Sequence, residues 1–108
     1  MDLTQKHCVP CEGGVEPFGP SQAAEYLGQV PSWELSKDGK SISRGFKFKN
    51  FAEGLAFVNK IGEIAENEGH HPDIELGWGY ARVKSTTHAI SCLSENDFIL
   101  AAKINAIN

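Results

Sequence analysis

The stretch NFAEGLAFVNKIGEIAENEGHHP, residues 50–72, decides how the rest of the chain is arranged. Apolar residues recur in it every three or four positions, which is typical of a helix that packs one face on a sheet. Asn50 followed three residues later by Glu53 matches a helix N-cap, and Gly69 suits the left-handed residue that ends many helices. We therefore predict a helix over 50–68. Its buried stripe is expected to be Phe51, Leu55, Val58, Gly62 and Ala65, widened by Phe57, Ile61 and Ile64.

Two strands and a short helix are expected before this long helix. Pro20 or Ser21 can start a helix that Gly28 stops. Residues 33–36 and 41–49 have strand character, and the Asp-Gly between them is a strong hairpin signal. In the second strand Ile42, Arg44, Phe46 and Phe48 share one face, and Arg44 is expected to reach past its apolar neighbours to water.

The part after the long helix predicts a second hairpin and a last helix. Residues 73–78 and 80–87 alternate with a period of two, and the turn is expected at Gly79-Tyr80. Ala81, Val83, Ser85 and Thr87 then share the side opposite Tyr80, Arg82, Lys84 and Thr86. The spacing of Ser94 and Asp97 resembles a capping box that opens a helix from Glu95 to about Ile107.

The order of elements, α-β-β-α-β-β-α, predicts an α+β fold, in which a four-stranded antiparallel sheet has its helices packed on one face. Residues 1–20, which are rich in Pro and Gly, are expected to be an extended arm, and residues 21–108 a single domain. The last helix is apolar on most sides, so we expect its second surface to contact another subunit. We therefore expect a homodimer or homotetramer whose subunits associate through this helix and a sheet edge.

Composition excludes several classes of function. The formal net charge is −4 and the sequence pI is about 5.5, which argues against binding to nucleic acid through phosphates. No apolar run approaches the roughly 20 residues that span a bilayer, and the first residues do not resemble a signal peptide. We expect a cytoplasmic protein, or an organelle-matrix protein whose transit peptide is missing. Three cysteines, an odd number, fit reduced thiols.

Three of the four histidines, His70, His71 and His88, fall within 19 residues. If the second hairpin forms, the start of its first strand and the end of its second are adjacent, and His70, His71 and His88 meet at one end of the sheet. Imidazole titrates near neutral pH, so such a cluster could act in acid–base chemistry. Pro72 favours an extended His71, and neighbours in an extended segment point in opposite directions. The residues alone therefore do not fix where the His71 ring points.

Metal binding is the alternative for the histidines and for the Cys8-x-x-Cys11 pair. Adjacent ligands in His70-His71 suit one tetrahedral ion poorly, and no carboxylate has typical ligand spacing to them. A closed zinc site at Cys8 and Cys11 would need two further ligands, for which only His7 and Cys92 are available. We therefore expect a turn-bearing arm and no metal.

The residues that carry a family resemblance are Trp33, Glu66-x-x-x-His70-His71-Pro72, His88 after a further 15 residues, and Leu93-Ser94-x-x-Asp97. This pattern resembles the pterin-4a-carbinolamine dehydratase family over about residues 21–107. The resemblance implies the α+β fold described above. It also implies an enzyme that dehydrates 4a-hydroxytetrahydrobiopterin to quinonoid dihydropterin, without a metal or cofactor, in tetrahydrobiopterin recycling.

By the same resemblance, the catalytic residues are His70, His71 and His88. His70 and His88 are expected to form the acid–base pair, and His71 to bind and orient the substrate. The predicted substrate-binding residues are Glu66, Pro72, Thr86, Thr87 and Trp33. The competing function is a non-enzymatic one, as an assembly or dimerisation partner of another protein, because animal members of the family act in this way through their helical surface.

Overall fold

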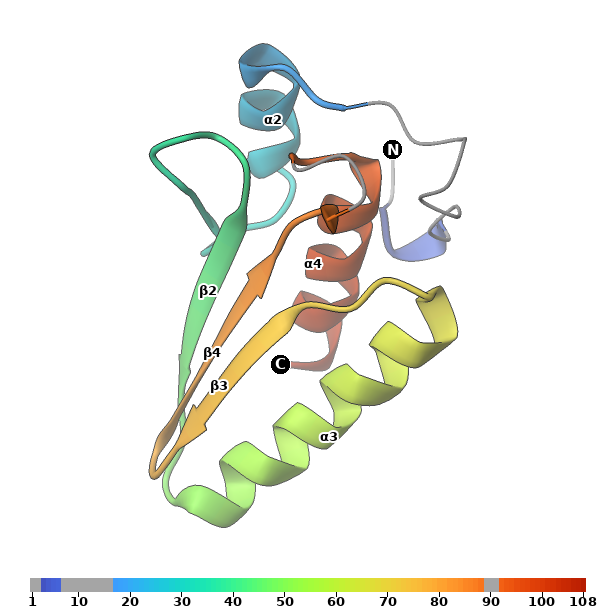
Figure 1. Ribbon diagram of the computed structural model, residues 1–108. Helices are drawn as coiled ribbons and strands as arrows, with labels where there is room; N and C mark the ends of the chain where they lie inside the picture. Colours follow the sequence, from blue (N-terminus) through green and yellow to red (C-terminus); the bar gives the residue numbers. More distant parts are fainter. Residues whose placement is uncertain (1–2, 7–16, 89–91) are drawn as a thin grey trace.

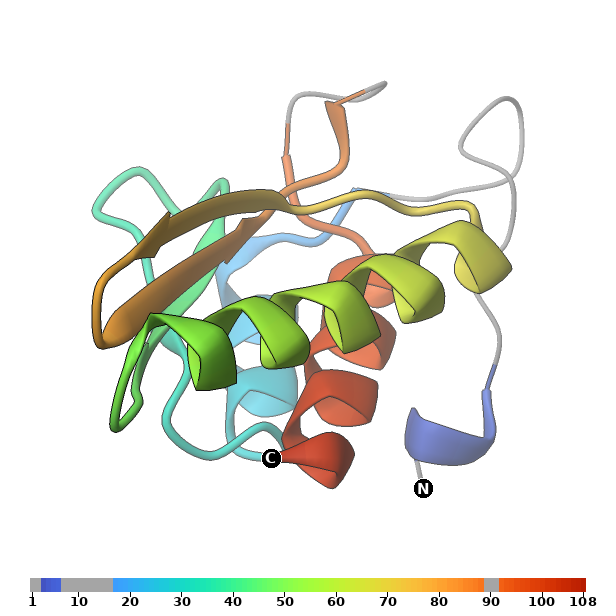
Figure 2. The ribbon, with the colours of Figure 1, turned by 90° about the horizontal axis from the view of Figure 1, so that it is seen from below.

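Four antiparallel strands form one sheet, and the helices lie on a single face of it (Figures 1 and 2). The computed structural model describes residues 3–6, 17–88 and 92–108. The predicted α+β class and order of elements are confirmed, with one short 3-10 turn added near the N-terminus. In chain order the elements are η1 (Leu3–Gln5), α2 (Pro20–Leu27), β1 (Glu34–Leu35), β2 (Ile42–Lys47), α3 (Phe51–Glu68), β3 (Asp73–Gly77), β4 (Tyr80–Ser85) and α4 (Glu95–Ile107).

The second hairpin, β3–β4, forms half of the sheet. The strand order is β1-β2-β4-β3, and the register pairs Asp73 with Lys84 and Gly77 with Tyr80. Its turn is Trp78-Gly79, one residue earlier than predicted, because Gly79 takes the left-handed φ of 82° that a tight turn requires. The hairpin brings the start of β3 and the end of β4 to the same end of the sheet.

Helix α3 has the predicted bounds, but its buried face is rotated from the predicted one. The Asn50 side chain accepts a hydrogen bond from the Glu53 amide at 2.9 Å, as expected of the N-cap. Phe51 and Leu55 were predicted to lie in the buried stripe, but they are 42% and 43% exposed. The prediction is wrong for both residues. Glycine at position 54 explains the rotation, because it lets sheet side chains approach the helix closely. The buried residues of α3 are Gly54, Phe57, Ile61 and Ala65.

Arg44 is half-buried, and its guanidinium has partners within the protein that the sequence analysis did not predict. Its guanidinium lies 4.5 Å from the centre of the Phe46 ring, and Nη1 donates a hydrogen bond to Asn105 Oδ1 at 2.6 Å. A partner on α4, distant in sequence, thus satisfies the charged group within the layer between sheet and helices.

Helix α4 is buried on most of its surface by its own chain. Leu3 of η1 is buried in the core cluster that includes α4, and Phe18 stacks on Phe98 with ring centroids 5.7 Å apart. Tyr26 of α2 packs on the same Phe98 ring. The apolar surface that predicted a second subunit is therefore covered within one chain, and oligomerisation through α4 stays a prediction.

Within residues 3–6, 17–88 and 92–108, none of the helices combines the length and apolar character needed to cross a bilayer. Cys8, Cys11 and His7 lie outside the described residues, so the predicted character of that part of the arm stays a prediction.

Candidate active site

His70 is placed by the way α3 ends. Gly69 adopts the left-handed conformation, with φ of 65°, and the His70 amide donates to the Ala65 carbonyl at 3.2 Å. This closes the helix and turns the chain toward β3. The His70 side chain points inward and is only 4% exposed. A histidine this deeply buried needs polar partners.

Asp97 supplies that partner from the first turn of α4. The distance from His70 Nε2 to Asp97 Oδ1 is 2.7 Å, and the carboxylate is fully buried. Three other groups donate to it. Ser85 Oγ lies 2.6 Å from Oδ1, while Thr87 Oγ1 and the Ser94 amide lie 2.8 and 3.0 Å from Oδ2. Both oxygens of this buried carboxylate therefore have hydrogen-bond partners, as buried polar groups require.

The sequence analysis did not identify two residues of this cluster, Ser85 and Asp97, as site residues. Asp97 was predicted as a helix cap, and its Oδ2 does bond the Ser94 amide, but its other oxygen binds His70. Ser85 was correctly placed with Thr87 on the inward face of β4. Polar residues on a buried strand face must find hydrogen-bond partners, and this was the available signal.

The other two histidines lie at the surface. The His71 ring is exposed, and its Nε2 is hydrogen bonded to Glu66, five residues earlier on α3. His88 is also exposed and directly follows Thr87, whose hydroxyl bonds Asp97. His70 and Thr87, the residue before His88, are thus both hydrogen bonded to the Asp97 carboxylate. His71 and His88 lie outside this buried cluster.

The predicted substrate-binding residues do not all lie at this place. Thr86 Oγ1 donates to the Lys40 carbonyl at 2.6 Å, and Pro72 is half-buried between His71 and β3. Trp33 is buried in the core, where Nε1 donates to Asn105 at 2.8 Å. Asn105 follows Asp97 by eight residues, about 12 Å along a helix of 1.5 Å rise per residue. The structure therefore places Trp33 toward the other end of α4.

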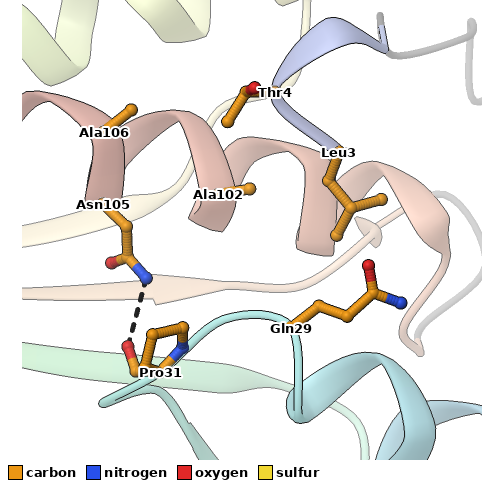
Figure 3. Close-up of a pocket in the computed structure, with 7 residues that line it drawn as sticks. All are labelled: Leu3, Thr4, Gln29, Pro31, Ala102, Asn105 and Ala106. Carbon is orange, nitrogen blue, oxygen red and sulfur yellow. Dashed lines mark hydrogen bonds between the residues drawn. The ribbon is translucent and has the colours of Figure 1, made fainter. Parts of the chain in front are cut away.

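Two cavities have different linings. One, of about 810 Å³, is lined by residues of α3 that include Glu66, the partner of His71. The other, of about 460 Å³, lies between η1, the loop after α2 and the end of α4, where Asn105 Nδ2 donates to the Pro31 carbonyl (Figure 3). The lining of the first includes Glu66 but none of the histidines, and the lining of the second includes none of the predicted site residues.

The donor set of the site suits proton transfer. The described part of the chain contains no group of three or more His, Cys, Asp and Glu side chains arranged to hold a metal ion. It contains instead one buried imidazole–carboxylate pair with two exposed imidazoles nearby in sequence. Such rings can donate or accept a proton near neutral pH.

Comparison with known proteins gives the chain its relatives. The model of the family described as pterin 4 alpha carbinolamine dehydratase matches residues 16–107. A protein from Halorhodospira halophila, named provisionally as a pterin-4-alpha-carbinolamine dehydratase, is 57% identical over 99% of this chain and 98% of its own length. A protein from Methylococcus capsulatus with the same provisional name is 50% identical over 97% of this chain and 92% of its own length.

A solved structure agrees with these relatives. The crystal structure of a transcriptional coactivator/pterin dehydratase from Brucella melitensis has a TM-score of 0.81 and 29% sequence identity to this chain. The match covers 85% of this chain and 98% of that one. The extent of the family match and the identity to the curated relatives show that the chain belongs to the pterin 4 alpha carbinolamine dehydratase family.

Proposed function

We propose that the protein is a hydro-lyase that dehydrates 4a-hydroxytetrahydrobiopterin to quinonoid dihydropterin. The observation that carries this proposal is the buried contact between His70, in the turn after α3, and Asp97 of α4. His71 and His88, which follow His70 and Thr87 in the chain, are exposed. Membership of the dehydratase family supports the same reaction. Its place would be cytoplasmic recycling of the pterin that aromatic amino-acid hydroxylases use.

The reaction requires one proton to be given and one to be taken. An imidazolium protonates the 4a-hydroxyl group, which leaves as water when its bond to C4a breaks. A neutral imidazole takes the proton from N5, and the electron pair of that N–H bond forms the new double bond to C4a. We assign the acid–base pair to His70 and His88. His71, held by Glu66, would bind and orient the pterin, with Pro72, Thr86, Thr87 and Trp33 as further proposed contacts.

The test is the rate of dehydration of 4a-hydroxytetrahydrobiopterin, followed as the appearance of the quinonoid product. Loss of a general acid or base typically costs about 10²–10⁴-fold in rate, so His70→Ala and His88→Ala should each lose activity on that scale. His71→Ala should mainly raise KM. Lys60→Ala, an exposed lysine in the middle of α3, is the matched control and should behave as wild type.

His70 is buried, so its replacement can also weaken the fold. His88 is exposed, and His88→Ala should therefore keep the unfolding midpoint of wild type while losing activity. Wild-type protein that gives no acceleration over buffer, or His70→Ala and His88→Ala variants that match wild type, would disprove the proposed reaction.

A second candidate function is that of a non-enzymatic assembly or dimerisation partner. The similar protein from Brucella melitensis is described as a transcriptional coactivator as well as a pterin dehydratase. In this chain Phe51, Leu55, Trp78 and Tyr80 are exposed, and they lie where the β3–β4 turn meets the start of α3 (Figure 1). Light scattering of the pure protein, with and without Trp78→Ser, measures self-association through these side chains. A monomer in both cases argues against the predicted homo-oligomer.

A further inference from the structure

We propose that a hollow on the outer face of β3 and β4 is a subsite for a hydroxylated side chain at C6 of the pterin, and that Asp73 and Lys84 set this preference. The proposal rests on the dehydratase function proposed above and deepens it, because it names the class of pterin that the protein prefers. Two observations carry it, the place of the hollow on the hairpin and the chemistry of the groups around it.

The hollow lies on the face of the sheet that the helices leave uncovered (Figure 2). Its volume is about 270 Å³, and its lining consists of residues 73–75 of the edge strand β3 together with Arg82 and Lys84 of β4. The four charged side chains of this lining are exposed, whereas Val83, between the two cations, is buried. The charged groups therefore face solvent around the hollow and not the core.

The same face continues to the end of the hairpin that carries the histidines. Exposed and buried residues alternate along β4, and the alternation continues beyond the strand, with Thr87 buried and His88 exposed. An extended chain spans at most about 3.6 Å per residue, so the Cα atoms of His71 and Asp73 lie within about 7 Å of each other, and those of Lys84 and His88 within about 14 Å. A substituent on a pterin held by these histidines can therefore reach the hollow.

The charged groups around the hollow do not pair with one another. In the antiparallel register Asp73 lies directly opposite Lys84, and Glu75 opposite Arg82. Opposite charges at such positions ordinarily attract each other. Among the described residues, however, the ion pairs all join other side chains, and of these four only Arg82 is hydrogen bonded, through Nη2 to a serine of β2 at 3.3 Å. Asp73 and Lys84 thus keep their hydrogen-bonding capacity for a ligand.

This combination of acceptors and donors suits hydroxyl groups. A carboxylate only accepts hydrogen bonds and an ammonium group only donates them, whereas a hydroxyl does both. A hydroxyl between Asp73 and Lys84 can donate to the first and accept from the second. The C6 substituent of 4a-hydroxytetrahydrobiopterin is a dihydroxypropyl group, which carries two such hydroxyls. An anionic substituent would be repelled by Asp73 and Glu75, and a methyl group would form no hydrogen bond with either partner.

The measurement compares two substrates that differ only at C6, 4a-hydroxytetrahydrobiopterin and its 6-methyl analogue. One hydrogen bond gained in exchange for water contributes about 2–10-fold to affinity, so the KM of wild type should be lower by this factor for the hydroxylated substrate. Asp73→Ala and Lys84→Ala should each bring the ratio of the two KM values toward one, by raising KM for the hydroxylated substrate. Lys84→Arg retains a cationic donor and should retain most of the preference.

Lys47→Ala is the matched control. Lys47 is an exposed lysine on the same face of the sheet, opposite Tyr80 at the other end of the hairpin, and its replacement should leave the ratio of KM values as in wild type. The ratio also separates recognition from folding. A variant that is merely less well folded loses activity toward both substrates alike, and its ratio stays at the wild-type value.

Equilibrium binding distinguishes this proposal from the proposed reaction. The ligands are 7,8-dihydrobiopterin and 6-methyl-7,8-dihydropterin, which lack the 4a-hydroxyl group and cannot be dehydrated. Wild type should bind the first more tightly, and Lys84→Ala should lose this preference.

A wild type that binds and turns over the two kinds of pterin equally would overturn the subsite and leave the reaction standing. An inactive wild type whose binding preference is lost in Lys84→Ala would disprove only the reaction. A preference that survives in both Asp73→Ala and Lys84→Ala, or a wild type that binds neither pterin, would overturn the subsite.

Discussion

At the scale of single residues, two glycines of the α3 segment have opposite conformational roles. Gly69 sits in the left-handed region with φ of 65°, and Gly62 lies inside the helix. A Cβ added at either position would meet nothing within 4 Å. The effect of an alanine at each site therefore depends on backbone conformation and not on packing.

Gly69→Ala should lower the free energy of unfolding by about 1–2 kcal/mol, because a left-handed backbone is costly for a residue with a side chain. Gly62→Ala should raise it by about 0.5–1 kcal/mol, because alanine restricts the unfolded chain and favours the helix. Urea titration of both variants and wild type measures the two changes. Shifts of the same sign would contradict the assigned conformations.

At the scale of elements, the end of α3 is joined to α4 by an ion pair. Lys103 Nζ lies 3.0 Å from Glu68 Oε2, with side chains 17% and 5% exposed. Glu68 stands two residues before His70, and Lys103 is on the helix that carries Asp97. The pair thus ties together the two elements that build the candidate site.

Lys103→Met should lower the free energy of unfolding by about 1–3 kcal/mol, because it removes the cation that lies 3.0 Å from the buried Glu68 carboxylate. The double variant Glu68→Gln/Lys103→Met should be less destabilised than the sum of its single variants. Lys60→Met, at an exposed position of α3, is the control and should stay within about 0.5 kcal/mol of wild type. Additive effects in the double variant would show that the pair contributes no coupling.

The elements themselves could be predicted from local sequence, because caps and periodicity are local. Asn50 and Gly69 marked the ends of α3, and alternation gave the inward face of β4. The rotation of α3 depends on what packs at Gly54, and the partner of Arg44 lies 61 residues away in the chain. These features follow from contacts distant in sequence, on which a local pattern carries no information.

The candidate site shows the same division. The turn at His70 and the adjacent ends of β3 and β4 could be predicted, since the hairpin pattern determines them. The His70–Asp97 contact spans 27 residues and depends on how α4 docks. The direction of the His71 ring depends on its hydrogen bond to Glu66, five residues earlier. Glu66 lies in α3 and His71 in the segment after it, so no single periodic pattern relates the two residues.

At the scale of the whole molecule, the N-terminal segment is fastened to the start of α4. Lys6 Nζ donates to Glu95 Oε2 at 2.8 Å, and the Tyr26 hydroxyl donates to the same oxygen at 2.9 Å. The hydrogen bond from Lys6 holds the pKa of Glu95 below its ordinary value of 4.5. The bond to Glu95 raises the pKa of Lys6 above 10.5 and that of Tyr26 above 10.0.

A depressed carboxyl pKa stabilises the folded state above the unfolded pKa, and this contribution is lost as pH falls through the folded value. Wild type should therefore be more stable than Lys6→Met at pH 7, and the difference should shrink below about pH 4.5. Because the raised Lys6 pKa acts in the alkaline range, it leaves this acid limb unchanged. Unfolding midpoints at pH 7, 5 and 3 measure the difference.

Lys47→Met, on the exposed side of β2, is the control for the loss of one positive charge. Its difference from wild type should not follow the titration of Glu95. A Lys6→Met variant whose deficit stays constant from pH 7 to pH 3 would mean that the contact of Lys6 with Glu95 does not anchor the segment.

The opposite surroundings of Trp33 and Trp78 have a spectroscopic consequence. The chain has two tryptophans, one 4% exposed with its indole nitrogen bonded to Asn105 and the other 73% exposed at the tip of the β3–β4 turn. Fluorescence of the folded protein is therefore the sum of a shielded emitter and a hydrated one. A dissolved quencher such as iodide reaches only Trp78. The blue-shifted emission that remains comes from Trp33 and reports on the core. The fraction of the emission that is quenched comes from Trp78 and reports whether anything covers the turn.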